Sequence, residues 1–133
     1  MKFVLDTNIC IHAMHSTSPI LAEHLESRYF GELILSTISL AELEYGIVAA
    51  APQDRQVRQD MLDSLLEDLV VAPFDAAAAR AYGEIRRADP MRGRNALDKL
   101  IAAHALSLGA VLVTNNEMDF RRFPGLVVEN WAA

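Results

Sequence analysis

The 133-residue chain contains a single cysteine, Cys10, so no internal disulfide can form. This fits a reducing compartment, and we expect a cytoplasmic protein. The longest apolar runs, such as 33–35 and 111–113, are far too short for a membrane-spanning helix. An acid interrupts the first apolar residues at position 6, so we expect no secretory signal peptide. The absence of a cysteine pair and of a His-x₃-His pattern argues against a zinc site.

Basic residues are also scarce overall, and the net charge of −6 argues at first sight against a nucleic-acid partner. The charges are unevenly distributed, however. Residues 1–66 carry nine acids and four bases, whereas residues 67–133 carry nine acids and eight bases. Because local charge decides where a polyanion binds, the acidic total weakens a nucleic-acid interpretation without excluding it.

The apolar pattern alternates between short buried segments and longer amphipathic ones. Strands are predicted at 2–5, 33–36, 69–72 and 110–113, and a fifth is indicated at 126–128. Helices are predicted at 7–14, 19–29, 39–50, 54–69, 75–88 and 97–108. Helices between short apolar strands supply the crossovers that parallel strands need. We therefore predict one domain, residues 1–133, with a three-layer α/β/α fold and a mainly parallel sheet of four to five short strands.

Acidic side chains occur where such a sheet presents its site, at the carboxyl ends of the strands. Asp6 follows the first strand, Glu42 lies about one helical turn beyond the second, and Asp98 opens the helix at 97–108. Asp119 lies in the polar segment after the fourth strand, together with Thr114, Asn115 and Asn116. Carboxylates that converge repel one another, and a hard divalent cation relieves that repulsion. The pattern therefore favours a Mg²⁺ or Mn²⁺ site.

Each acid also has a purely structural interpretation. Asp6 fits the N-cap of the helix that begins at Thr7. Glu42 completes a Ser-x-x-Glu capping box with Ser39. Asp98 suits the positive end of a helix dipole, and Asp119 suits the cap of a short turn. For each acid alone, the structural interpretation explains the residue as well as a functional site does. Only the recurrence of acids after successive strands favours a shared site.

The histidines point less clearly to chemistry. His104 joins the apolar stripe of its helix, which predicts a half-buried core histidine. His12 and His15 are predicted at the surface or an interface, and Cys10 in the core.

Four stretches carry a resemblance to a known family: "FVLDTNICI", "STISLAELEYG", "NALDKLIAAHALSLGAVLVTNNEMDFRRFPGL" and "VVENWAA". In this order they resemble PIN-domain proteins, and more closely the VapC-type ribonuclease toxins of bacterial type II toxin–antitoxin pairs. Only 15–30 and 50–70 fall outside the likeness. The resemblance implies a Mg²⁺- or Mn²⁺-dependent endoribonuclease that cuts tRNA or another structured RNA and arrests growth by inhibiting translation. It also implies a VapB-type antitoxin and a homodimer within a larger complex.

The resemblance assigns roles to the acids. Asp6 and Asp98 match metal ligands, and Glu42 matches an acid that binds the metal through water or orients the attacking water. The fourth acid is Asp119, with Asn116 and Thr114 in support, although many relatives carry an acid at the position of Asn116. Basic residues that flank the third acid are predicted to contact the RNA backbone, with a solvated helix face as the alternative: Arg86, Arg87, Arg92, Arg94 and Lys99.

Two other functions stay open at this point. A Mg²⁺-dependent phosphatase with an aspartyl nucleophile also begins with a strand that ends in Asp, but it requires Asp-x-Asp, and here Asn8 occupies the third position. A catalytically inactive PIN-like binding module would keep the fold without the full set of acids, as Asn116 suggests.

Overall fold

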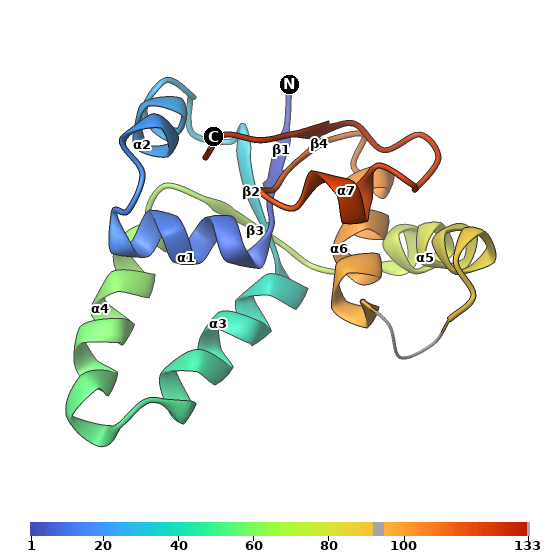
Figure 1. The fold of residues 1–133 in the computed structure, drawn as a ribbon. Coiled ribbons are helices and arrows are strands. Elements are labelled where there is room, and N and C mark those ends of the chain that lie inside the picture. Colours follow the sequence, from blue (N-terminus) through green and yellow to red (C-terminus); the bar gives the residue numbers. More distant parts are fainter. Residues whose placement is uncertain (92–94, 133) are drawn as a thin grey trace.

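A five-stranded sheet forms the centre of the computed structural model, which describes residues 1–91 and 95–132 (Figure 1). Its strands are β1 (Phe3–Leu5), β2 (Leu33–Ser36), β3 (Val70–Ala72), β4 (Val111–Val113) and β5 (Val128–Glu129). They lie in the order β3-β2-β1-β4-β5, and each neighbouring pair is parallel. The predicted α/β fold with a parallel sheet is confirmed.

Helices connect these strands, as parallel pairing requires. They are α1 (Thr7–His15), α2 (Pro19–Glu26), α3 (Thr37–Ala49), the 3₁₀ turn η1 (Pro52–Asp54), α4 (Arg55–Leu66), α5 (Ala76–Ala88), α6 (Ala96–Ser107) and the short α7 (Glu117–Phe120). Within the described ranges, no helix is long and apolar enough to cross a membrane.

The predicted boundaries differ from the structure by up to three residues, and the largest differences are at the ends of α2 and α4, predicted at 29 and 69 and found at Glu26 and Leu66. Helix α3 begins at Thr37, two residues before the predicted start, because the Ser36 hydroxyl accepts a hydrogen bond from the Ile38 backbone N–H at 3.1 Å and so caps the helix. Strand β5 begins at Val128 instead of residue 126. A turn that brings the Leu126 N–H to the Phe123 carbonyl, with Gly125 at a φ of 81°, delays the strand.

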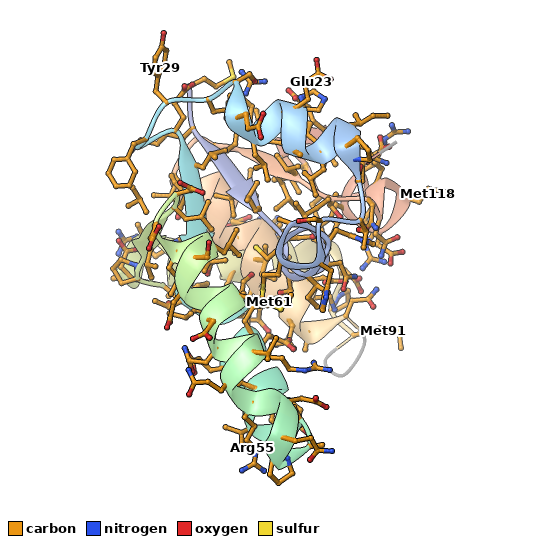
Figure 2. The ribbon with its side chains drawn as sticks, turned by 90° about the vertical axis from the view of Figure 1, so that its left-hand side faces the viewer. Glu23, Tyr29, Arg55, Met61, Met91 and Met118 are labelled. Carbon is orange, nitrogen blue, oxygen red and sulfur yellow. The ribbon has the colours of Figure 1, made fainter. Side chains whose placement is uncertain are left out.

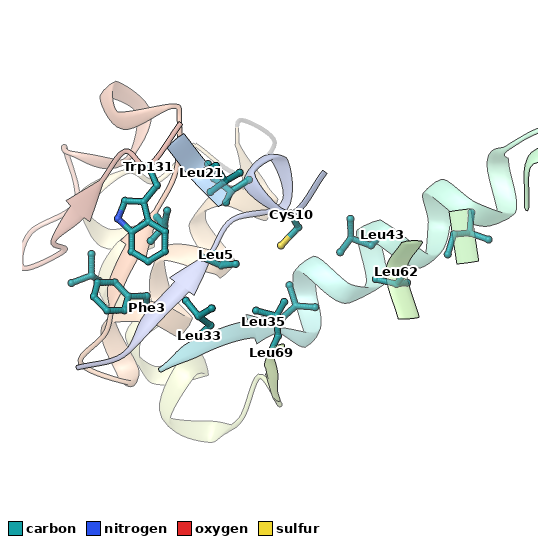
Figure 3. Close-up of a cluster of buried hydrophobic side chains, with 14 residues drawn as sticks. Phe3, Leu5, Cys10, Leu21, Leu33, Leu35, Leu43, Leu62, Leu69 and Trp131 are labelled. Atoms are coloured by element: carbon teal, nitrogen blue, oxygen red, sulfur yellow. The ribbon is translucent and has the colours of Figure 1, made fainter. Parts of the chain in front are cut away.

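The sheet separates two hydrophobic cores, because successive strand residues point to opposite faces. Phe3 and Leu5 pack on one face, with α1, α2, α3 and α4, and Trp131 closes that core (Figure 3). Val4 and Ile34 pack on the other face, against α5 and α6. Figure 1 shows these two groups of helices on opposite sides of the sheet, which confirms the three-layer arrangement.

Helices α3 and α4 extend beyond the sheet as a pair. Arg55, at the start of α4, lies at the far end of this extension (Figure 2). Leu43 and Leu62 are buried between the two helices (Figure 3), whereas Tyr45 and Val57 remain exposed. The pair therefore has its own apolar contact, and Glu42 lies in the middle of α3.

A buried hydrogen bond joins α6 to the start of α3. The His104 Nδ1 atom lies 2.7 Å from the Ser36 hydroxyl, and the His104 ring packs edge-on against Phe74. The prediction of a core histidine is confirmed, and the side chain is fully buried instead of half-buried. Because α6 carries Asp98 and α3 carries Glu42, this bond helps to set the relative position of two predicted site residues.

We expect stability to depend on pH through His104. Burial lowers the pKa of His104, so the folded protein resists protonation more than the unfolded chain does. The contribution of neutral, buried His104 to folding stability is complete above the pKa of histidine in the unfolded chain, about 6.5. It is lost as the pH falls towards the lower pKa of His104 in the folded protein. Urea unfolding at pH 7.5 and 5.5 should show a smaller difference for His104→Gln than for the unaltered protein.

The exposed His15→Gln, on α1, is the matched control and should leave the difference between the two pH values unchanged. An equal pH dependence in His104→Gln and the unaltered protein would contradict the assignment to His104.

Candidate active site

The site lies where the order of strands reverses. From β1 the chain proceeds outward through β2 to β3, then returns to place β4 on the other side of β1. At such a switch point the connections leave in opposite directions and open a crevice at the carboxyl ends of the strands. Asp6 directly follows β1 and Thr114 directly follows β4, and the Asp6 N–H donates to the Val113 carbonyl at 3.0 Å.

Asp6 has both a structural and an electrostatic role. One carboxylate oxygen accepts a hydrogen bond from the Ile9 N–H at 2.8 Å, so Asp6 caps α1 as its structural interpretation predicts. A carboxylate has two acceptor oxygens, so the hydrogen bond that caps α1 does not prevent Asp6 from binding a ligand in the crevice. Burial raises the pKa of Asp6, and hydrogen bonds with the Thr114 side chain and the Ile9 N–H partly offset that rise.

Asp98 lies within electrostatic reach of the other three predicted acids. It lies half-buried in the first turn of α6. Burial raises the pKa of Asp98, and the negative charges of Asp6, Asp119 and Glu42 raise it further, while the positive charge of Arg122 opposes them. Three acids from other parts of the chain therefore act electrostatically on Asp98.

Glu42 does not serve as a capping-box residue. Helix α3 is capped by Ser36, so Ser39 lies inside the helix and the Ser39–Glu42 capping box is wrong. The buried Ser39 hydroxyl instead accepts a hydrogen bond from Thr7 at 3.2 Å, which ties α3 to α1. Glu42 is half-buried and lines a pocket of about 100 Å³ with Ile11 and Met61.

Asp119 is held by the polar residues that follow β4. The Asn116 side-chain amide donates to the Asp119 carboxylate at 2.6 Å, and the Asn116 N–H donates to the Thr114 hydroxyl at 3.0 Å. Asp119 lies within α7, whose N-cap is Asn116, so its interpretation as a cap is wrong. Asn116 thus contacts Asp119 directly, Thr114 contacts Asn116, and the catalytic roles of all three stay predictions.

Lys99 corrects one prediction. Its side chain is fully buried, with Nζ 3.5 Å from the Asp89 carboxylate, and it donates a hydrogen bond to the Met91 carbonyl. A buried ammonium in this position has no access to an RNA backbone, so the predicted RNA contact of Lys99 is wrong. The helical pattern of α6 alone did not reveal this, because Asp89 and Met91 lie outside the helix.

The predicted RNA-binding arginines differ in their surroundings. Arg86 donates to the Tyr82 hydroxyl at 3.2 Å, and Arg87 lies on the surface 3.8 Å from Glu84. Arg92 and Arg94 fall outside the described residues. Arg122, which was not among the predicted residues, contacts Asp89 at 3.0 Å and acts electrostatically on Asp98. Its position after α7 gave only a weak signal, since the partner lies 33 residues earlier in the chain.

The donor set at this edge suits a hard cation. It consists of carboxylates with hydroxyl and amide neighbours, and its mutual repulsion is the kind that a divalent ion relieves. Among residues 1–91 and 95–132, no three His, Cys, Asp or Glu side chains are arranged to hold a metal ion. Mg²⁺ commonly binds through one or two carboxylates and keeps several waters, so the residues fit an ion of this type without a closed protein cage.

Comparisons with known proteins identify the family. The PIN domain family model matches residues 3–126. "Ribonuclease VapC2" of Rickettsia felis is 37% identical over 98% of both chains. "tRNA(fMet)-specific endonuclease VapC" of Shigella flexneri is 34% identical over 99% of both.

Solved structures show the same fold. The chain in VapBC2 from Rickettsia felis, bound to a promoter DNA fragment, has a TM-score of 0.87 and 35% identity, and the match covers 98% of this chain and 99% of that one. The chain in DNA-bound VapBC from Salmonella typhimurium has a TM-score of 0.89 and 32% identity over 98% of each chain. The chain described here therefore belongs to the PIN-domain family and, within it, to the VapC ribonucleases.

Proposed function

We propose that this protein is a Mg²⁺- or Mn²⁺-dependent endoribonuclease and the toxin of a type II toxin–antitoxin pair. The observation that carries the proposal is that Asp98, in the first turn of α6, is close enough to Asp6, Asp119 and Glu42 for their negative charges to act on its carboxyl group. The ribonuclease names of its relatives support the same activity.

Asp6 and Asp98 would hold the ion, with Glu42 binding it through water. When bound, a divalent ion lowers the pKa of a water and offsets the charge that develops on the phosphate. The Ile9 N–H fixes the Asp6 carboxylate, and Asn116 fixes that of Asp119. Glu42 orients the attacking water and accepts its proton. Because water attacks instead of the ribose 2′-hydroxyl, the products carry 5′-phosphate and 3′-hydroxyl ends.

The substrate we propose is tRNA, which would explain an arrest of translation in the cytoplasm. Two relatives, from Shigella flexneri and Salmonella typhimurium, are named tRNA(fMet)-specific endonucleases, so tRNA(fMet) is the first RNA to test. The related structures are VapBC assemblies, and we propose a VapB-type antitoxin for this chain, bound to a homodimer in a larger complex.

Purified protein should cleave tRNA(fMet) with Mg²⁺ or Mn²⁺ and not with EDTA, leaving ends that a 5′-phosphate-dependent exonuclease recognises. Glu42→Gln should lower the cleavage rate by about 10²-fold or more, since it removes the base that orients the water. The neighbouring exposed Glu44→Gln is the matched control and should cleave normally. Cleavage in EDTA, or 2′,3′-cyclic phosphate ends, would contradict the mechanism.

The same experiment addresses the alternatives. The PIN-domain match contradicts the aspartyl phosphatase, which belongs to another family. An inactive binding module predicts instead that Glu42→Gln and the unaltered protein bind antitoxin equally and that neither cleaves RNA.

A further inference from the structure

Outside the four acids, the structure holds a second charged cluster, formed by Asp89, Lys99 and Arg122. The Asp89 carboxylate lies 3.5 Å from Lys99 Nζ and 3.0 Å from Arg122 Nη2. Asp89 directly follows α5, Lys99 lies in the first part of α6, and Arg122 follows α7. The cluster therefore ties together three segments, one of which, α6, also carries Asp98.

Burial changes steadily across this cluster. The Lys99 side chain is 0% exposed, that of Asp89 16% and that of Arg122 34%. A buried ammonium needs a paired anion, and Asp89 supplies it for Lys99. The charge of Asp89 is therefore already balanced on its buried side. Two cations share one carboxylate, so the cluster keeps one net positive charge, and Arg122 is the member that reaches solvent.

The Arg122 guanidinium is also held in place. One nitrogen contacts Asp89, and the group lies over the buried Phe123 ring, 4.9 Å from its centre. A guanidinium carries five N–H donors, so the Asp89 contact leaves donors for a second anion. Fixed guanidinium groups of this kind are well suited to phosphate oxygens.

The positive charge of Arg122 lies near the predicted acids. Lys99 directly follows Asp98 in the chain, and Arg122 lies three residues after Asp119. The positive charge of Arg122 acts on Asp98 against the charges of the other acids. A phosphodiester that approaches four carboxylates is repelled, and a nearby fixed cation is the feature that lets it bind.

We propose that Arg122, held by Asp89 over the buried Lys99, binds a phosphate of the RNA strand next to the acids. Arg122 is then a substrate-binding residue, and Asp89 and Lys99 are positioning residues. The inference rests on the proposed ribonuclease function, and it adds a binding residue outside the basic stretch at 86–99.

The test is the binding of fluorescein-labelled tRNA(fMet) in EDTA, where cleavage is prevented, measured by anisotropy between 50 and about 200 mM KCl. Arg122→Ala should weaken binding about tenfold at the low-salt end and reduce the salt slope by about one. Arg122→Lys should retain part of the affinity. Because Arg121 forms its own ion pair with Glu117, Arg121→Ala is the matched control and should change the slope little.

With Mg²⁺ added, Arg122→Ala should raise KM more than it lowers kcat, which a change in folding alone would not produce. Equal affinity and slope for Arg122→Ala and Arg121→Ala, in a protein that still cleaves tRNA, would overturn this inference and leave the proposed function intact. An unaltered protein that neither binds nor cleaves RNA would overturn both.

Discussion

Asp98→Asn is expected to abolish RNA cleavage, by about a thousandfold or more, and at the same time to make the protein more stable. The loss follows because Asp98 is a proposed ligand of the ion that activates water and offsets phosphate charge. The gain follows because burial, and then the like charges nearby, raise the pKa of Asp98 and so destabilise the folded protein when Asp98 is ionised.

The stability gain should depend on pH in a defined direction. Since the folded pKa of Asp98 is raised, its ionised form is destabilising at neutral pH, and this penalty disappears as the pH falls below the folded pKa. In thermal unfolding at pH 7, the Asp98→Asn protein should therefore melt a few degrees above the unaltered protein. The two proteins should converge in acid.

Asp63→Asn provides the matched control for this charge change. Asp63 lies exposed on α4, where it accepts a hydrogen bond from Gln59, away from the four acids. It should leave both cleavage and melting temperature close to those of the unaltered protein. An Asp98→Asn protein that still cleaves tRNA or arrests growth would remove Asp98 from the mechanism.

Lys99→Ala is expected to cause the largest loss of stability, about 3 kcal/mol, or roughly 10 °C in melting temperature. Lys99 is fully buried, so its removal leaves a cavity, opens the hydrogen bond to the Met91 carbonyl and takes away a partner of Asp89. Cleavage should fall as well, because these contacts hold the first turn of α6, which carries Asp98.

The surface pair of Arg87 and Glu84 offers a contrast within the same region. Both side chains are more than three-quarters exposed, at 84% and 77%, so Arg87→Ala should change stability by less than about 0.5 kcal/mol. Lys99→Met keeps most of the side-chain volume, so its loss of stability should lie between those of Arg87→Ala and Lys99→Ala. A melting temperature for Lys99→Ala within one or two degrees of the unaltered protein, by scanning calorimetry, would show that the buried pair contributes little.

The sequence alone was sufficient for the order and type of the main elements. Short runs such as Phe3–Leu5 and Val111–Val113 are apolar on both faces, as buried parallel strands must be. Asp6 was recognisable as a helix cap because a cap depends on neighbours within a few residues. The candidate acids could be found for a related reason, since a parallel sheet brings its strand ends to one edge.

Tertiary structure decided what depends on contacts between distant residues. Which serine caps α3 followed from the placement of Ser36 at the end of β2, and Ser39 was taken up by Thr7 from another helix. Lys99 looked like a surface cation until Asp89 and the Met91 carbonyl supplied its partners inside the fold. The burial of a side chain and its charged neighbours depend on all the groups around it in space. The sequence therefore determined which strand ends carry the acids, and only the packing determined which cations lie beside them.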